Sequence, residues 1–158
     1  MSRIIHQRCI ATNNDGGRCK RVTLRSNKCW SHLLRDEHLR IKPSTIPGAG
    51  LGLFEEAPVK KGAFISAYTG KYRDDDSDKF YPYGLRVGPG HVLIDGRKSN
   101  TAPARYINDA RKASKNNARF SVYTGKKPHT AKVVATKGIP KDREVFLPYG
   151  RDYWKSDM

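Results

Sequence analysis

The chain has 158 residues, of which 37% are hydrophobic and 29% charged, enough for one domain with a core or for a small domain plus an appendage. No apolar run approaches the roughly 20 residues that cross a bilayer, and residues 1–6 show no signal-peptide hydrophobic region. We therefore expect an intracellular protein without membrane contact. The net charge of +16 favours a polyanionic neighbour such as nucleic acid, with solubility alone as the alternative.

All three cysteines lie near the start of the chain, at Cys9, Cys19 and Cys29, and His32 follows two residues after the last of them. Three sulfurs and one imidazole form a complete tetrahedral set for zinc. Residues 1–32 are too few and too polar to bury a core, so we expect the metal to organise them. The pattern resembles small zinc-binding motifs with three cysteines and one histidine. The alternative is three incidental thiols beside a core histidine. An odd cysteine count favours a reducing compartment.

The segment after the cysteines predicts a basic amphipathic helix over residues 31–40, which connects the knuckle to the rest of the chain. The composition changes at residue 41. We therefore divide the chain into a zinc-binding knuckle with its connecting helix, residues 1–40, and a second domain, residues 41–158.

Glycines at 48, 50 and 52 let the backbone approach a ligand closely. No Gly-Lys-Ser/Thr closes the segment, and no long amphipathic helix follows, so it indicates neither a Walker loop nor a dinucleotide fold. The glycines alternatively serve only hairpins.

The rest of the second domain is built from short β-rich runs separated by glycines, with little predicted helix. Such a pattern is typical of a mainly β domain. The runs cover residues 63–70, 91–94, 121–123, 131–136 and 144–147.

Asn108 and Asp109 stand side by side after the apolar pair Tyr106 and Ile107. A polar-lined crevice would give this pair a use, whereas Asn-Asp is also common turn chemistry. The order of motifs around the pair decides between the two interpretations.

Over residues 44–154 that order resembles the SET domain family of protein-lysine methyltransferases. Each motif is weak alone, but six occur in the family's order. They are residues 48–54 (the opening G-x-G), 68–70 (Y-x-G), 94–95, 105–109 (R-F-I-N-H), 117–118 (N-A) and 144–150 (E-L-x-x-x-Y-G). The resemblance implies a mainly β fold of several small sheets with a knot-like C-terminal segment.

The resemblance also implies that the chain transfers a methyl group from S-adenosylmethionine to a protein lysine. It implies catalytic roles for Tyr149 and Tyr68, which would orient the amine and line its channel; outside the motifs both would be ordinary core tyrosines. Leu147, two residues before Tyr149, has no hydroxyl to hold a water, so we expect that more than one methyl can be added. The cofactor-binding residues implied are Gly50, Leu51, Gly52, Arg105, Asn108, Asp109 and Trp154.

The implied contacts with the cofactor differ by residue. Main-chain groups at Gly50 and Gly52 would meet its methionine portion, and Asn108 offers both a donor and an acceptor. Asp109 replaces the family's histidine, which contributes to the adenine site largely through its main chain. No cysteines follow the domain, so Trp154 is expected to cover the adenine or to serve as an apolar lid.

The charge distribution suggests a chromatin substrate in a nucleus, or in a host-cell nucleus if the protein is a viral or microbial effector. The acidic run at residues 74–78 would attract a basic histone or other chromatin-associated protein. The knuckle and the basic loop with Arg111, Lys112 and Lys115 would contact nucleosomal DNA. A non-catalytic SET-like chromatin or nucleic-acid-binding module is the alternative, favoured by Asp109. A zinc-dependent nucleic-acid protein with an unrelated β domain is the third.

Overall fold

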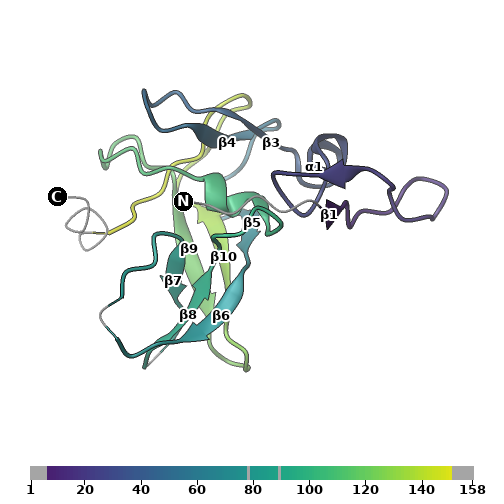
Figure 1. Cartoon of the computed structure of the whole chain (residues 1–158). Coiled ribbons are helices and arrows are strands. Elements are labelled where there is room, and N and C mark those ends of the chain that lie inside the picture. Colours follow the sequence, from purple (N-terminus) through teal and green to yellow (C-terminus); the bar gives the residue numbers. More distant parts are fainter. Residues whose placement is uncertain (1–6, 78, 89, 151–158) are drawn as a thin grey trace.

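The computed structural model describes residues 7–77, 79–88 and 90–150 (Figure 1). Trp154 and Asp78, two residues of the sequence predictions, lie outside the described residues. The described chain is mainly β, with several small sheets and one α-helix, as predicted; the sheets are antiparallel, and one 3-10 helix was not predicted. Within these ranges, no helix has the length and apolar character needed to cross a membrane.

The N-terminal part projects to one side of the molecule (Figure 1). Strand β1 (Gln7–Arg8) pairs with β2 (Val22–Thr23), and helix α1 (Trp30–Glu37) follows. The helix ends three residues before the predicted end at residue 40, so that boundary was wrong. His38 takes a left-handed conformation, with φ of 55°, and Leu39, fully buried, starts the next strand. Burial of Leu39 in the core ends the helix there.

Strands β3 (Leu39–Pro43) and β4 (Leu51–Glu55) form an antiparallel hairpin. Gly48 and Gly50 lie in its loop at φ of 77° and 76°. The division expected between residues 40 and 41 falls inside β3, so the knuckle and the second domain share this strand.

Two further sheets lie beside the hairpin. One has the order β5-β10-β9 and the other β6-β8-β7. The predicted runs at 63–70, 91–94, 121–123 and 131–136 are confirmed as strands, whereas β6 and β7 were not predicted. The bounds are β5 (Phe64–Tyr68), β6 (Lys71–Asp74), β7 (Gly84–Arg86), β8 (Val92–Asp95), β9 (Ala118–Tyr123) and β10 (Thr130–Ala135).

Residues 144–147 do not form the predicted strand but make isolated bridges to two distant segments. The Val145 N–H donates to Leu53 of β4 at 2.8 Å, and the Leu147 N–H donates to Asn108 at 3.0 Å. Phe146 bridges Asn108 in parallel. Residues 144–147 thus have partners on both sides. The C-terminal segment is inserted between β4 and the chain that follows the 3-10 helix η1 (Pro103–Tyr106). This insertion brings Tyr149 next to Asn108 and Asp109.

One hydrophobic core joins these parts. Leu53, Val133, Val145 and Leu147 are at most 1% exposed and belong to one buried cluster. Leu33 of α1 belongs to the same cluster, so the helix docks the knuckle onto the second domain.

Candidate active site and metal centre

The four ligand atoms of Cys9, Cys19, Cys29 and His32 lie within 4.8 Å of one another. His32 Nδ1 is 3.6 Å from Cys9 Sγ and 3.4 Å from Cys29 Sγ. A tetrahedral zinc ion with bonds of about 2.0 to 2.3 Å separates its ligands by roughly 3.5 to 3.8 Å. The donor set and its spacing therefore fit zinc.

Main-chain N–H groups point at the sulfurs. Cys29 donates to Cys9 Sγ at 3.2 Å, and Ala11 donates to the same atom at 3.5 Å. Arg21 donates to Cys19 Sγ at 3.5 Å. Such donors stabilise thiolates, the form in which cysteine binds a metal. The loops around the cysteines are thus shaped for thiolate ligands.

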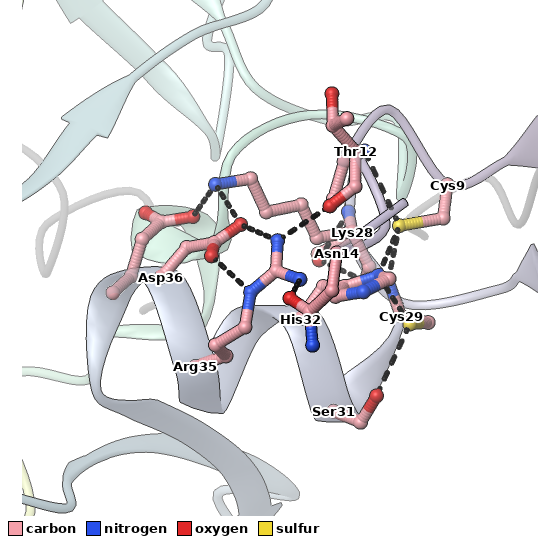
Figure 2. A network of polar contacts seen from close by, with 12 residues as sticks. Cys9, Thr12, Asn14, Lys28, Cys29, Ser31, His32, Arg35 and Asp36 are labelled. Atoms are coloured by element: carbon pink, nitrogen blue, oxygen red, sulfur yellow. Dashed lines mark hydrogen bonds and ion pairs between the residues drawn. The ribbon is translucent and has the colours of Figure 1, made fainter. Parts of the chain in front are cut away.

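Helix α1 is tied to the knuckle by a polar network, which Figure 2 shows around Cys9, Cys29 and His32. Arg35 donates to the Thr12 carbonyl at 2.7 Å and pairs with Asp36 at 2.6 Å. Lys28 pairs with Asp36 at 3.4 Å and with Glu37 at 3.1 Å. These contacts fix the orientation of the helix that carries His32.

A cavity of about 680 Å³ opens in the second domain. Among the described residues its lining includes five of the predicted site residues: Leu51, Tyr68, Arg105, Asn108 and Tyr149. Gly50, Gly52 and Asp109 are not part of the described lining, and Trp154 lies outside the described residues. Cavities of this size hold cofactors and small ligands.

Tyr68 ends strand β5 and is 7% exposed. Its hydroxyl donates to the Tyr83 carbonyl, and its ring meets Phe120 edge-on at 5.2 Å between centroids. Burial raises the pKa of Tyr68 above its usual value, so the side chain stays a neutral phenol. A Cβ on Gly70 would overlap the Asp95 carbonyl, which explains the glycine two residues after the tyrosine.

Tyr149 reaches the cavity from the C-terminal segment. Its hydroxyl donates to the Ile107 carbonyl at 2.6 Å. Its main-chain N–H donates to Asp109 Oδ2 at 2.9 Å. Asp109 Oδ1 also accepts from the Arg111 N–H at 2.7 Å and from Asn116 Nδ2 at 3.3 Å. The buried carboxylate of Asp109 therefore connects the polar loop to the backbone of the tyrosine.

Asn108 and Gly52 meet at the carboxylate of Glu144. Asn108 Nδ2 donates to the Leu51 carbonyl at 3.0 Å and to Glu144 Oε2 at 3.4 Å. The same carboxylate accepts from Ser44 Oγ at 2.7 Å and from the Thr45 hydroxyl at 2.6 Å. A Cβ on Gly52 would overlap this carboxylate. Packing against Glu144 thus explains why residue 52 is a glycine, and the approach of Gly52 to a cofactor stays a prediction.

Arg105 is 7% exposed and holds the turn after β8. Its guanidinium donates to the Gly96 carbonyl at 2.8 Å and to the Arg97 carbonyl at 2.9 Å. It also lies 4.7 Å from the ring centroids of both Tyr83 and Tyr106. These contacts organise the wall of the cavity; a contact of Arg105 with a cofactor stays a prediction.

Asp75 of the acidic run is connected to the cavity through Tyr81, which is a lining residue. The Tyr81 hydroxyl donates to Asp75 Oδ2. Hydrogen bonds from Ser77 and Tyr81 lower the pKa of Asp75 to about 2, so this carboxylate stays charged at neutral pH. A negative charge therefore lies beside the cavity.

Tyr83, Leu85 and Phe120 are among the lining residues that sequence reasoning missed. The sequence has an aromatic stretch at residues 80–83. Its concentration of rings beside a short strand was the available signal for Tyr83. Phe120 has no local signal, since its place depends on the pairing of β9 with β10.

A family model described as SET domain matches residues 50–150. No curated protein matches the sequence. Solved structures of Polycomb repressive complex 2 from Chaetomium thermophilum are similar in fold. One, autoinhibited and bound to S-adenosylmethionine, has a TM-score of 0.62 and 21% identity, covering 76% of this chain and 16% of that chain. Another has a TM-score of 0.60 and 23% identity, covering 72% and 15%. The chain therefore spans only a small part of the length of these neighbours, and the likeness concerns the fold.

Proposed function

Because the chain belongs to the SET domain family, we propose that it transfers a methyl group from S-adenosylmethionine to the side-chain amine of a lysine in another protein. The observation that carries the proposal is that Tyr68 and Tyr149, from distant segments, line one cavity together with Asn108. Two phenols that line one cavity suit the recognition of an amine better than a surface turn would.

The chemistry needs an uncharged amine. The reference pKa of lysine is about 10.4, so at pH 7 only roughly one amine in a few thousand is neutral. Ile107, Phe120 and Leu147 give the cavity apolar walls, which disfavour the charged ammonium and lower the pKa of an entering amine. When bound, S-adenosylmethionine supplies the methyl group and a positive sulfonium.

The two phenols act as acceptors. Each hydroxyl proton is donated to a main-chain carbonyl, of Tyr83 for Tyr68 and of Ile107 for Tyr149. Each oxygen therefore presents lone pairs to other groups, and an amine N–H is the matching donor. Because Tyr68 stays neutral, its role is to orient the amine rather than to remove its proton.

The cofactor side of the cavity would be formed by Leu51, Asn108 and Arg105. Asn108 Nδ2 donates its hydrogens to the Leu51 carbonyl and to Glu144. Oδ1 is therefore the atom that Asn108 would offer to the ammonium of the cofactor. Gly50, Gly52 and Asp109 would contribute only main-chain groups. We propose that Trp154 covers the adenine.

Zinc at Cys9, Cys19, Cys29 and His32 would be structural. All four ligand positions belong to the protein, which leaves no open position for a substrate. The metal would hold the knuckle (residues 1–40) as a unit beside the SET domain (residues 41–158).

The proposed substrate is a histone or another chromatin-associated protein in a nucleus. Support comes from the charged Asp75 beside the cavity, which would attract a basic chain, and from the net charge of +16, which favours DNA nearby. The exposed Arg111, Lys112 and Lys115 would contact nucleosomal DNA. Leu147 in the cavity wall has no hydroxyl to hold a water, so more than one methyl would be possible.

The test is incubation with labelled donor and a panel of free histones and nucleosomes, followed by mass spectrometry. We expect labelled lysine with wild type and at least a hundredfold loss with Tyr149→Phe, in line with the removal of a group positioned for the transition state. Labelling that Tyr149→Phe leaves unchanged would contradict the proposal.

A non-catalytic SET-like module remains the second candidate, because Asp109 stands where the resemblance implies a histidine. Absence of donor binding in calorimetry, together with salt-sensitive DNA binding, would select it.

A further inference from the structure

A second hollow, of about 680 Å³, lies between the knuckle and strand β3, and we call it the knuckle groove. It shares no described lining residue with the cavity of the active site. Its walls come from β2 and the residues after it, from the first turn of α1, and from β3. The residues used below are Arg21, Val22, Leu24, Arg25, Trp30 and Arg40.

The groove exposes large apolar side chains to water. Trp30 is 69% exposed, Val22 63% and Leu24 46%. Single exposed apolar residues are ordinary, but three around one hollow mark a surface that meets a partner. Trp30 is the first residue of α1 and contributes no packing to the core, so the fold does not explain its size.

The charge of the groove has one sign. Its described lining holds four cations and no carboxylate. Lys28 is neutralised by Asp36 and Glu37, and Arg40 pairs with Glu56 at 3.1 Å. Within the described chain, Arg21 and Arg25 form no ion pair. These two guanidiniums are left for a partner, and the partner they fit is an anion.

Arg21 and Trp30 form one surface. The Arg21 guanidinium carbon lies 5.8 Å from the centroid of the Trp30 ring. A flat aromatic group that stacks here meets the indole, while an anionic group attached to it reaches the guanidinium. A nucleotide has this combination, with a base on one side and a phosphate on the other.

We propose that the knuckle groove binds single-stranded nucleic acid, with a base stacked on Trp30 and the neighbouring phosphates on Arg21 and Arg25. In a duplex the bases are stacked on each other, so Trp30 would have no base face to meet. An acidic peptide would use the guanidiniums but would leave the indole unexplained. The inference goes beyond the nucleosomal DNA contact proposed above, because it concerns a single strand and a different set of residues.

The knuckle is fixed to the SET domain, so a bound strand would be held at a set position relative to the active site. The Asn27 N–H donates to the Thr101 carbonyl at 3.1 Å, and Gln7 Nε2 donates to the Asn100 carbonyl at 3.4 Å. Leu33 anchors α1 in the shared core. The groove would thereby select protein substrates that lie near exposed single strands.

The experiment measures fluorescence anisotropy of the full zinc-loaded chain with labelled oligo-dT and oligo-U of about 12 nucleotides, and with a duplex of the same length. No methyl donor is added, so the outcome does not depend on catalysis. We expect single strands to bind more tightly than the duplex. The oligo-dT and oligo-U arms distinguish DNA from RNA as the source of the strand.

Three variants locate the binding. Trp30→Ala should weaken it about tenfold, and Trp30→Phe should retain most of it, because stacking on an aromatic contributes about 1 to 3 kcal/mol per base. The pair Arg21→Gln and Arg25→Gln should reduce the slope of log Kd against log salt by about 1.4, or about 0.7 for each lost phosphate contact.

The matched control is the pair Lys126→Gln and Lys132→Gln. It removes the same charge from exposed positions on the β9–β10 hairpin, away from the knuckle (Figure 1). The control should keep the wild-type affinity and most of the wild-type salt slope, and zinc content and circular dichroism should be unchanged in every variant.

Four outcomes would overturn the proposal: equal losses in both pairs, an unchanged affinity in Trp30→Ala, tighter binding of the duplex, or displacement of the strand by polyglutamate at equal charge. Tyr149→Phe should bind the strand like wild type, which separates this test from that of methyl transfer.

Discussion

Asp109 and Tyr149 are joined by a hydrogen bond in which the tyrosine N–H donates to Oδ2 at 2.9 Å. The residue that replaces the family's histidine therefore holds the backbone of the proposed catalytic tyrosine. The same carboxylate accepts from the Arg111 N–H and from Asn116. Asp109 is thus suited to position Tyr149.

Replacing Asp109 tests this role. Asp109→Ala removes the acceptor of buried N–H groups, which costs about 1 to 3 kcal/mol, and should shift Tyr149. We expect kcat to fall at least tenfold while the affinity for donor, measured by calorimetry, changes little. Asp109→Asn keeps one oxygen for the Tyr149 N–H and should recover part of kcat. A change confined to KM, or no difference between Ala and Asn, would contradict a positioning role.

The Tyr68 hydroxyl should matter for orientation rather than for proton removal. Tyr68→Phe loses one acceptor of the amine and one of the two donors to the Tyr83 carbonyl, which keeps the Gly96 N–H at 3.0 Å. We expect kcat/KM for the protein substrate to fall about ten- to a hundredfold. The dependence of the rate on pH should keep its shape, since a buried neutral phenol does not titrate near neutrality. Loss of a titration step in the variant would assign Tyr68 the role of a base instead.

Motif order was informative wherever chemistry depends on a short local pattern. The three cysteines and the closely following His32 predict a metal site, and the structure brings the ligand atoms of Cys29 and His32 to 3.4 Å. The Y-x-G at residues 68–70 marks a turn that only glycine fits, because the Asp95 carbonyl fills the space of a Cβ. Patterns of this kind are readable because few residues and one backbone conformation decide them.

Features that depend on distant partners could not be read in the same way. Residues 144–147 have strand-like composition, yet they bridge Leu53 on one side and Asn108 on the other instead of joining a sheet. The role of Gly52 depends on Glu144, a residue far along the chain. Phe120 enters the cavity only because β9 pairs with β10. Each of these outcomes is decided by tertiary contacts.

Metal removal should unfold the knuckle while leaving the SET domain core largely formed. Within the described residues, the buried cluster that the knuckle has to itself is small, made of its cysteines and Ala11, so zinc is expected to supply most of its stability. We expect about one zinc per chain by elemental analysis, and its loss in Cys19→Ser. Chelation should change the fluorescence of the exposed Trp30. A zinc-free chain with an unchanged spectrum and unchanged stability would contradict a structural metal.

Glu55 should make stability depend on pH. Its side chain is 2% exposed, and burial raises its pKa from 4.5 to about 7. A raised folded-state pKa means that the folded protein binds the proton more tightly than the unfolded chain does. The contribution of Glu55 is therefore fully present below pH 4.5 and is lost as the pH rises through about 7, by up to about 3 kcal/mol.

The measurement is urea unfolding of wild type and Glu55→Gln at several pH values. The free energy of unfolding of wild type, relative to that of Glu55→Gln, should fall between pH 4.5 and 7 and level off above that range. The comparison cancels the titration of the other carboxylates, which have their own slopes. A difference that stays constant over this range would show that Glu55 has the same pKa in both states.

Gly52→Ala should destabilise the junction between the β3–β4 hairpin and the C-terminal segment. The added methyl would overlap the Glu144 carboxylate and lie 3.3 Å from Ser44 Cα. Glu144 holds Ser44 and Thr45 by hydrogen bonds, so it cannot move without breaking them. We expect the free energy of unfolding to fall by about 1 to 3 kcal/mol. Gly138→Ala is the matched control, because its new methyl meets only the Val59 carbonyl at 3.8 Å, and its stability should stay within about 0.5 kcal/mol of wild type. Equal stability of the two variants in urea unfolding would show that Glu144 yields to the methyl group.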